Sequence, residues 1–205
     1  QDSWDNSGLQ IDNNNAEVRG VLICFDITEK SLQEAIDKHC NVIVAHHPLL
    51  FNGLKQIGHD AYIERCVRMA IVNNIAIYCN HTPIDKVQGG VSWTLAQKLG
   101  LQNISYLQTD GMASYGAIGN LQHPLSHNDF ISLLKNTFGL TYVRCSEPLN
   151  NPISKVAVCG GSGAFLIDDA IKARADAFIC GDIKHHEFYK AEQKILLADI
   201  GHFES

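Results

Sequence analysis

The chain has 205 residues, of which 45% are hydrophobic and 19% charged, and its 16 basic and 22 acidic side chains give a formal net charge of -6. This composition is that of a globular protein, and the length favours one domain or one domain with two lobes. The acidic balance argues against a surface that binds nucleic acid or an anionic membrane, and no apolar run approaches the ~20 residues that a membrane-spanning helix needs. There is no signal peptide and no initiator Met, so we expect the natural protein to extend beyond both ends of this sequence.

In the first half of the chain, short β-branched runs alternate with amphipathic stretches, which predicts an α/β fold with mostly parallel strands. Apolar residues in the amphipathic stretches recur every three or four positions, as Leu32, Ala35 and Ile36 do, and this is the spacing of a helix. The predicted strands are 18–25, 42–45 and 75–79, and the predicted helices are 29–39, 61–72 and 92–99.

The middle of the chain, from about residue 101 to 152, is less regular. It predicts a strand over 114–121, a helix over 126–138 and a strand over 141–145. Ser126 with Asp129 in the first turn is typical of a helix start. The Asn-Asn-Pro run at 150–152 predicts a hinge between two halves.

The last part of the chain repeats the pattern of the first. It predicts strands over 155–159, 177–180 and 195–199 and helices over 164–173 and 184–193. Both series run strand, helix, strand, helix, strand, with polar residues just past the strands, which indicates two similar α/β lobes facing each other. We therefore expect a single domain over 1–205, with lobe one at about 1–100, a connecting segment at about 101–152 and lobe two at about 153–205. The alternative is chance similarity between ordinary α/β units.

The seven cysteines form no Cys-x-x-Cys pair. Four of them lie inside apolar runs, where a free thiol behaves as a small buried hydrophobe; they are Cys24, Cys79, Cys159 and Cys180. This usage argues against a disulfide framework or a cysteine zinc site and favours a reducing cytoplasm.

Histidines and aspartates gather just past the predicted strands. Ligands of parallel α/β sheets collect beyond the carboxyl ends of the strands, so these are the candidate functional residues. They are His46, His47, His81, Asp85, Asp182, His185, His186 and His202. The remaining histidines are expected to be structural or at the surface; they are His39, His59, His123 and His127.

His46 and His47 follow an apolar run directly. Adjacent side chains of a strand point to opposite faces, but at a strand end the chain can turn, and Pro48 keeps His47 extended. Two such imidazoles could each serve one of two neighbouring metal ions, or they could be a hydrogen-bonded pair in a loop. Asp85 could bridge two ions or cap a loop or helix. A terminal His202 would mean little alone, and it is the convergence of these residues that indicates a site.

The glycine-rich turn at 159–164 lies between a strand and a helix, where its amides could cradle an anion. It matches neither the dinucleotide fingerprint, nor the Walker A pattern, nor the Gly-x-Ser-x-Gly spacing of a hydrolase elbow, and a tight turn explains it equally well. Cys159 and Ser162 are the candidate nucleophiles for a cysteine or serine hydrolase. Nothing in the sequence pairs either of them with a histidine, which disfavours that reading.

Five motifs occur together and in order along the chain. They are Trp-Asp-Asn-Ser-Gly-Leu-Gln at 4–10, His-His-Pro-Leu-Leu-Phe at 46–51, His-Thr-Pro-Ile-Asp at 81–85, the turn at 159–163 and Gly-His-Phe-Glu-Ser at 201–205. With them the chain closely resembles, nearly end to end, the NIF3-like family, also called type 2 GTP cyclohydrolase I homologs. The resemblance implies two similar α/β lobes with a dinuclear metal site in the cleft between them, assembly into ring-shaped hexamers built from dimers, and the compact form that lacks an inserted domain.

The resemblance also implies a set of ligands for two divalent metal ions, which could be zinc, iron, manganese or cobalt. By motif, these ligands are His46, His47, Asp85 and His202. The family motif ends His-x-x-x-Glu, and that glutamate would be residue 206, one past the end of this sequence. A leading helix and a C-terminal tail are expected outside the sequence as well.

The function implied by the resemblance is hydrolysis, and the cyclohydrolase name refers to opening of the purine ring of GTP. Two neighbouring cations can make hydroxide from water near neutral pH and stabilise an oxyanion or phosphoryl oxygen. The candidates for proton transfer or for holding the ligands in place are His81, Asp182, His185 and His186, while Trp4, Asp5 and Asn6 could close over the site. We expect a cytoplasmic metal-dependent hydrolase of a nucleotide-like small molecule that works as a homo-oligomer. The alternative is a non-enzymatic metal-binding scaffold, trafficking protein or regulatory protein.

Overall fold

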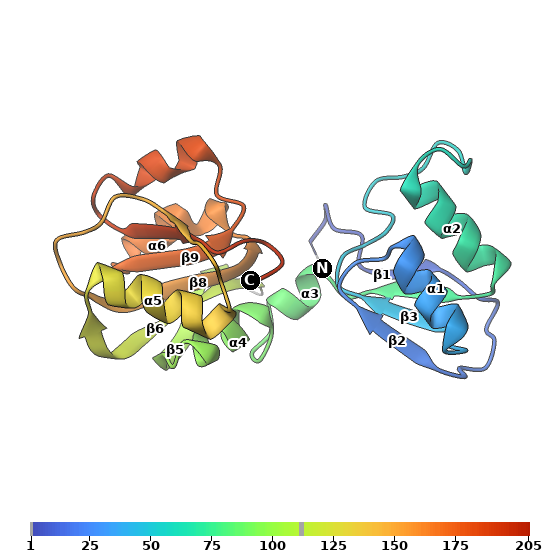
Figure 1. Ribbon diagram of the computed structural model, residues 1–205, viewed down its shortest axis with the longest axis horizontal. Coiled ribbons are helices and arrows are strands. Elements are labelled where there is room, and N and C mark those ends of the chain that lie inside the picture. The colour runs from blue at the N-terminus through green and yellow to red at the C-terminus, as the bar shows by residue number, and fades with distance from the viewer. Residues whose placement is uncertain (1, 111–112) are drawn as a thin grey trace. The chain divides into compact units, whose positions relative to one another are not determined.

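The structure is a computed structural model and describes residues 2–110 and 113–205. Contacts between residues divide the chain into two compact units, Gln1–Ile84 and Asp85–Ser205, each with its own sheet (Figure 1). Each unit therefore carries some of the candidate functional residues.

The first unit has a four-stranded sheet in the order β1-β4-β3-β2. The three parallel strands are β2, β3 and β4, and β1 pairs antiparallel with β4. The elements in chain order are β1 (Gly8–Ile11), β2 (Val21–Cys24), α1 (Glu29–Asp37), β3 (Val42–Ala45), α2 (Tyr62–Val72) and β4 (Ala76–Cys79).

Helices α1 and α2 pack on the same face of this sheet. Leu32 of α1 and Val67 of α2 join Ile43 of β3 in one buried cluster. Side chains of the opposite face are exposed, and Ile23 of β2 and Tyr78 of β4 lie in one row across the strands on that face. Burial therefore alternates along β2 and β3, as in a sheet with one covered face.

The second unit has a six-stranded sheet in the order β5-β6-β8-β9-β10-β7. Strands β8, β9 and β10 are parallel, and the other pairs are antiparallel. The elements are α3 (Thr82–Asp85), which crosses the division between the units, α4 (Val91–Lys98), β5 (Gln102–Asp110), β6 (Ala113–Leu125), α5 (His127–Phe138), β7 (Arg144–Cys145), β8 (Ile153–Ser162), the 3-10 helix η1 (Ala164–Leu166), α6 (Ile167–Lys172), β9 (Ala177–Gly181), the 3-10 helix η2 (His185–Ala191) and β10 (Leu196–Asp199).

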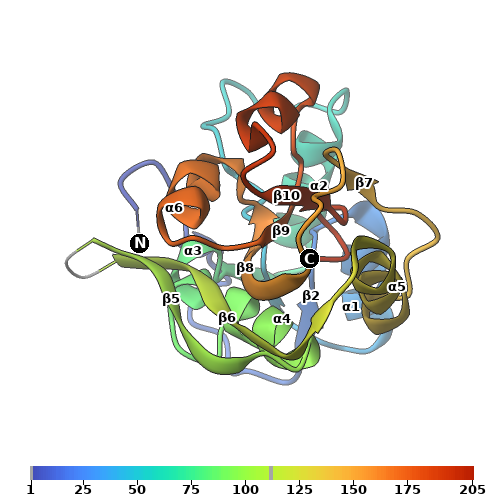
Figure 2. The same ribbon diagram turned by 90° about the vertical axis from the view of Figure 1, so that its left-hand side faces the viewer.

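Both faces of the second sheet are covered by helices. Helices α4 and α5 pack on one face through residues such as Leu95 and Phe130, and η1 and α6 pack on the other through Leu166 and Ile167 (Figures 1 and 2). Every residue of β9 and β10 is buried as a result. This explains why these strands read as continuous apolar runs rather than as alternating patterns.

The two sheets repeat one topology, as the sequence predicted. In each, three successive strands (β2, β3, β4 and β8, β9, β10) lie side by side in parallel. The strand that precedes them in the chain, β1 or β7, pairs antiparallel with the last of the three. Strands β5 and β6 then extend the second sheet beyond β8.

Several elements differ from those expected. Strands β1 and β5 and helix α3 were not predicted, and the predicted strands 18–25 and 141–145 are shorter in the structure. The predicted helix 184–193 is the shorter 3-10 helix η2, and the helix expected over 164–173 begins as the 3-10 turn η1.

The two compact units do not divide where the expected lobes do. The division falls after Ile84, not near residue 100, because α4 packs with β6 and β8 in the second core. The expected connecting segment 101–152 supplies β5, β6, α5 and β7 to the second unit. The Asn-Asn-Pro run at 150–152 lies within this unit, directly before β8, and not between the halves.

All seven cysteines are free thiols. Cys79, Cys159 and Cys180 are buried and Cys24 is half-buried. Burial raises the pKa of the Cys79 and Cys159 thiols to about 12. Among the described residues, no helix is long and apolar enough to cross a membrane.

Candidate metal centre

Three histidines come together at the carboxyl ends of two neighbouring parallel strands of the first unit. His46 and His47 directly follow β3, and one residue, Asn80, lies between the end of β4 and His81. One ligand atom of each lies within 4.8 Å of those of the other two, and the ring centroids are 4.9 to 5.4 Å apart. The three half-buried imidazoles could together bind one metal ion.

The end of β3 explains how two adjacent histidines face the same site. The backbone amides of His46 and His47 both donate to the carbonyl oxygen of Phe25, at 3.2 and 3.1 Å, so the chain turns where the regular ladder stops. The Phe25 ring stacks on His46 and lies edge-on to His47, with centroids at 5.4 and 4.5 Å. This apolar contact fixes both imidazole planes from one side.

Carboxylates hold two of the three rings. Nδ1 of His47 lies 2.8 Å from Oδ1 of Asp26, and Nδ1 of His81 lies 2.8 Å from Oδ1 of Asp5. A carboxylate on Nδ1 fixes the tautomer and makes Nε2 the nitrogen that is left for a metal ion. This carboxylate–histidine arrangement is typical of metal sites, so the residues present fit a divalent cation.

Asp5 lies beneath His81 with a fully buried side chain. It accepts hydrogen bonds from the hydroxyls of Ser7 and Thr82, both at 2.6 Å, and from the Thr82 amide at 3.3 Å. Burial by itself would raise the pKa of Asp5, but the hydrogen bonds from Ser7, Thr82 and His81 outweigh it and hold the pKa well below the usual range. Asp5 therefore remains a carboxylate and orients the imidazole from below.

The other residues expected to close over the site are placed differently from Asp5. The exposed Trp4 ring lies 6.3 Å from the His81 ring, edge to face. Asn6 donates from its side-chain amide to the carbonyl oxygen of Leu50, which ties this first segment to the loop after the histidine pair.

The second unit holds a similar pair just past its own parallel strands. Nδ1 of His202 lies 2.6 Å from Oδ2 of Asp182, and the Ser162 hydroxyl donates to the same oxygen at 2.6 Å. The hydrogen bonds from Ser162 and His202 lower the pKa of Asp182. The imidazole of His202 also rests against Gly161, where a Cβ would lie 3.3 Å from the ring.

The other candidates belong to the second unit. Asp85 is the last residue of α3, at the start of the second unit. His185 and His186 are exposed on η2, and Nε2 of His185 lies 3.4 Å from the Tyr189 hydroxyl. Sequence reasoning missed Asp26, although it follows the first parallel strand just as the chosen candidates follow theirs.

The glycine-rich turn does not offer its first amides to an anion. The amide of Gly160 donates to the Ser92 hydroxyl at 3.2 Å, and that of Gly161 donates to the Ser205 hydroxyl at 3.0 Å. Burial raises the pKa of the Cys159 thiol to about 12, so it stays protonated, and the Ser162 hydroxyl donates to Asp182 rather than to a histidine. The turn is better explained as a structural connection.

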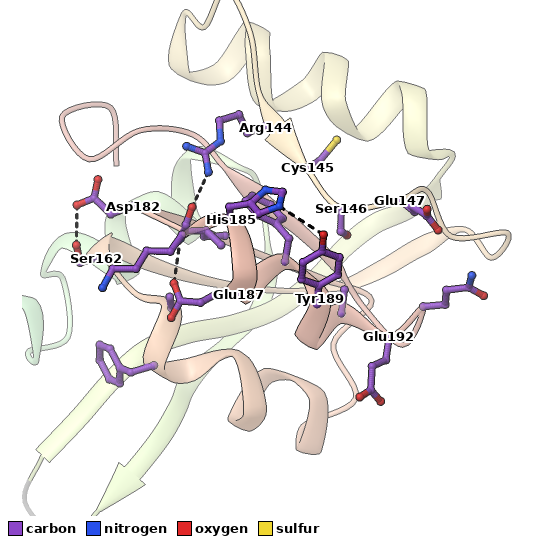
Figure 3. A pocket seen from close by; sticks show the side chains of 17 residues that line it. Arg144, Cys145, Ser146, Glu147, Ser162, Asp182, His185, Glu187, Tyr189 and Glu192 are labelled. Atoms are coloured by element: carbon purple, nitrogen blue, oxygen red, sulfur yellow. Dashed lines mark hydrogen bonds between the residues drawn. The ribbon is translucent and has the colours of Figure 1, made fainter.

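A pocket of about 1350 Å³ lies beyond the carboxyl ends of β8 and β9 in the second unit (Figure 3). Ser162 and Asp182 are part of its lining, as are Arg144 and Tyr189, which the sequence did not single out. Tyr189 lies four residues after His185 on η2, and no local pattern marks Arg144 on the short strand β7.

The sequence of this chain is similar to those of known proteins. A sequence model of the family described as Duf34/NIF3 (NGG1p interacting factor 3) matches residues 1–205. The chain is 33% identical over 210 residues to a Clostridium perfringens protein named GTP cyclohydrolase 1 type 2 homolog, covering 100% of this chain and 80% of that protein. It is 34% identical over 205 residues to a Streptococcus pneumoniae protein of the same name, covering 97% of this chain and 77% of that protein.

Two solved structures are also similar. A Bacillus cereus protein related to NIF3 matches with a TM-score of 0.92 at 26% identity, covering 100% of this chain and 84% of that one. A hypothetical protein of Staphylococcus aureus matches with a TM-score of 0.92 at 29% identity, covering 99% of this chain and 80% of that one. These likenesses confirm the α/β fold that the sequence predicted.

Proposed function

This chain belongs to the Duf34/NIF3 family, and from that premise we propose that it is a metal-dependent hydrolase that uses two divalent ions to act on a nucleotide-like small molecule. The observation that carries the proposal is the cluster of His46, His47 and His81, with carboxylates on the Nδ1 atoms of two of the rings. The names of the curated relatives support a nucleotide as the substrate class.

The proposed ligands are those of the family motifs, namely His46, His47, Asp85 and His202. Imidazole nitrogens with a carboxylate suit zinc, iron or manganese. Bound divalent ions would supply hydroxide near neutral pH and would stabilise an oxyanion or a phosphoryl oxygen. The place of His81 within the cluster makes it a candidate third histidine ligand, besides its expected role in proton transfer.

The residues around the ligands have separate tasks in this proposal. Asp26 and Asp182 fix the imidazoles of His47 and His202 through Nδ1, so that each ring keeps one tautomer and one orientation. Asp5 does the same for His81, whose Nε2 would then serve either as a metal ligand or in proton transfer, but not in both roles at once. Asp182 and His185 remain the other candidates for proton transfer. The proposed location of the protein is a reducing cytoplasm, which its seven free thiols support.

Metal content per chain is the first test. The protein is purified without chelator or a histidine tag and measured by plasma mass spectrometry, and we expect about two equivalents. His47→Ala, Asp85→Ala and His202→Ala should each lower this content, whereas His123→Ala, which removes an exposed histidine of β6, should not. Absence of metal even after reconstitution with zinc, manganese and iron would refute the proposal.

Turnover separates the enzyme from the alternative of a metal-binding scaffold. Metal-loaded protein is incubated with GTP, other nucleotides and phosphoesters, and the products are separated by chromatography. We expect metal-dependent hydrolysis that His47→Ala abolishes. Two bound equivalents without any product, with metal that exchanges freely with the medium, would favour the scaffold.

A further inference from the structure

The pocket of the second unit has two walls that carry exposed aromatic rings. Phe165 of η1 is 56% exposed, yet its ring is fixed by the Tyr115 ring, which meets it edge-on at 5.3 Å. Tyr189 of η2 is 71% exposed and meets the His185 ring edge-on at 5.6 Å (Figure 3). Exposed rings that are held in place around a cavity are typical of sites that bind a flat ring by stacking.

The charges that line the pocket are mainly negative. Four carboxylates contribute, and these are Glu147, Asp182, Glu187 and Glu192. The two cations are Arg144 and Lys184. Carboxylates accept hydrogen bonds from N–H groups and repel phosphate, so the lining favours a ligand with N–H donors over an anion.

Arg144 belongs to the wall of the pocket. Its guanidinium donates to the carbonyl oxygen of Ile183 at 2.5 Å, lies 3.6 Å from Oδ2 of Asp199 and covers the Phe188 ring at 5.4 Å (Figure 3). These contacts hold the group in place. The glycine turn does not offset the negative lining, because the Gly160 and Gly161 amides donate to serine hydroxyls.

From this lining we infer that the pocket binds a flat heteroaromatic ring that carries amino or ring N–H donors, such as an aminopurine. The ring stacks on Phe165 or Tyr189, and its N–H groups donate to the carboxylates of the lining. One of these is Glu187, whose Oε2 also accepts from the Lys184 amide at 2.9 Å. Asp182 joins this pocket to His202, since its Oδ2 accepts from that imidazole. The inference rests on the proposed function in one respect, namely that the bound ring is part of the substrate.

The test measures binding without turnover. The whole chain is stripped of metal, and the fluorescence of 2-aminopurine riboside is followed during titration, because stacking quenches this probe. We expect saturable quenching that guanosine and adenosine reverse by competition. Inorganic phosphate at the same concentration should not compete, because the pocket lining is acidic.

The variants are matched for exposure. Phe165→Ala and Tyr189→Ala should each raise the dissociation constant of the probe about tenfold, through loss of stacking. Tyr142→Ala is the control, since Tyr142 is 72% exposed, like Tyr189, but is not among the residues that line the pocket. Glu187→Gln should weaken binding severalfold because it removes a charged acceptor.

Three results would overturn the inference: no saturable quenching at millimolar protein, equal weakening by Tyr142→Ala, or competition by phosphate as strong as that by guanosine. The outcomes are distinct from those of the hydrolase proposal. Binding of the probe without hydrolysis of any nucleotide would leave the pocket assigned and refute the hydrolase. Hydrolysis of a nucleotide without binding of the probe would support the hydrolase and refute the assignment of the pocket.

Discussion

At the level of single residues, the same histidine–carboxylate pair occurs three times in the part of the chain that the structure describes. A histidine just past a parallel strand receives a carboxylate on Nδ1, in the pairs His47–Asp26, His81–Asp5 and His202–Asp182. The carboxylates differ in burial, since Asp5 is fully buried while Asp26 and Asp182 are each more than half exposed. Asp182 also has a left-handed backbone with φ of 55°, a conformation that costs free energy and is common at functional sites.

The burial of Asp5 predicts a large effect on stability. Asp5→Ala leaves the hydroxyls of Ser7 and Thr82 without their buried acceptor, so it should lower the free energy of unfolding of the first unit by roughly 2–4 kcal/mol in urea titration. Asp26→Ala is the control and should cost less than about 1 kcal/mol, because Asp26 is solvated. Both should weaken metal binding by about 10–100-fold. Equal losses of stability, or unchanged metal affinity, would contradict this account.

Gly161 predicts an effect of a different kind. Its φ is +62°, and a Cβ there would lie 3.3 Å from the His202 ring, whereas Gly139 has φ of +67° with nothing within 4 Å. Gly161→Ala and Gly139→Ala should each cost roughly 1–2 kcal/mol of stability, measured by urea titration, for the left-handed backbone. Only Gly161→Ala should also weaken metal binding, because it displaces the imidazole. Unchanged metal affinity in that variant would argue against His202 as a ligand.

At the scale of elements, two strands of similar sequence have different surroundings. Strand β2 is Val-Leu-Ile-Cys and β9 contains Ala-Phe-Ile-Cys. Strand β9 lies between two layers of helices and is buried along its whole length, while β2 is an edge strand with one face covered. The difference comes from the number of helices that pack on each sheet and not from the strands themselves.

This difference predicts that replacing isoleucine by alanine lowers the free energy of unfolding much more in β9 than in β2. Ile179→Ala in β9 leaves a cavity in a closed core, so it should lower the free energy of unfolding by about 2–5 kcal/mol. Ile23→Ala in β2 removes a side chain that is 80% exposed and should change it by less than about 0.5 kcal/mol. Urea denaturation of both variants measures the two values, and similar losses would show that the first sheet is covered in solution.

In the whole molecule, the repeated strand topology indicates that the two units are versions of the same fold. The second unit adds β5 and β6 and a second layer of helices to the plan of the first. Each unit has its own buried core and its own histidine–carboxylate pairs. The proposed ligand residues are accordingly found in both units, His46 and His47 in the first and Asp85 and His202 in the second.

The oligomeric state is a property of the whole molecule that can also be predicted. The family resemblance leads us to propose a homo-hexamer, and a chain of 22.6 kDa would then sediment as a particle of about six times that mass. Sedimentation velocity at several protein concentrations measures this mass. A single species at the mass of one chain would refute the proposed hexamer.

The α/β class, the positions of the six parallel strands and the internal repeat could be predicted from the sequence alone. These follow from local patterns, since apolar periodicity and turn residues act over a few positions. The sequence also placed His46, His47, His81, Asp182 and His202 at strand ends, because the carboxyl ends of parallel strands share one edge. The helix start at Ser126 was likewise a local signal, and its hydroxyl accepts from the Asp129 amide.

The contacts between groups far apart in the chain could not be predicted from local patterns. Asp5 lies 76 residues before His81, and nothing local to Asp5 indicates that it will lie beneath that imidazole. Strand β1 pairs with the distant strand β4, with Gly8 opposite Cys79, and this short strand has no strong apolar pattern of its own. The lining of the pocket likewise comes from β7, β8, η1 and η2. Such contacts depend on how complete elements pack, which is a property of the folded chain and not of any short segment.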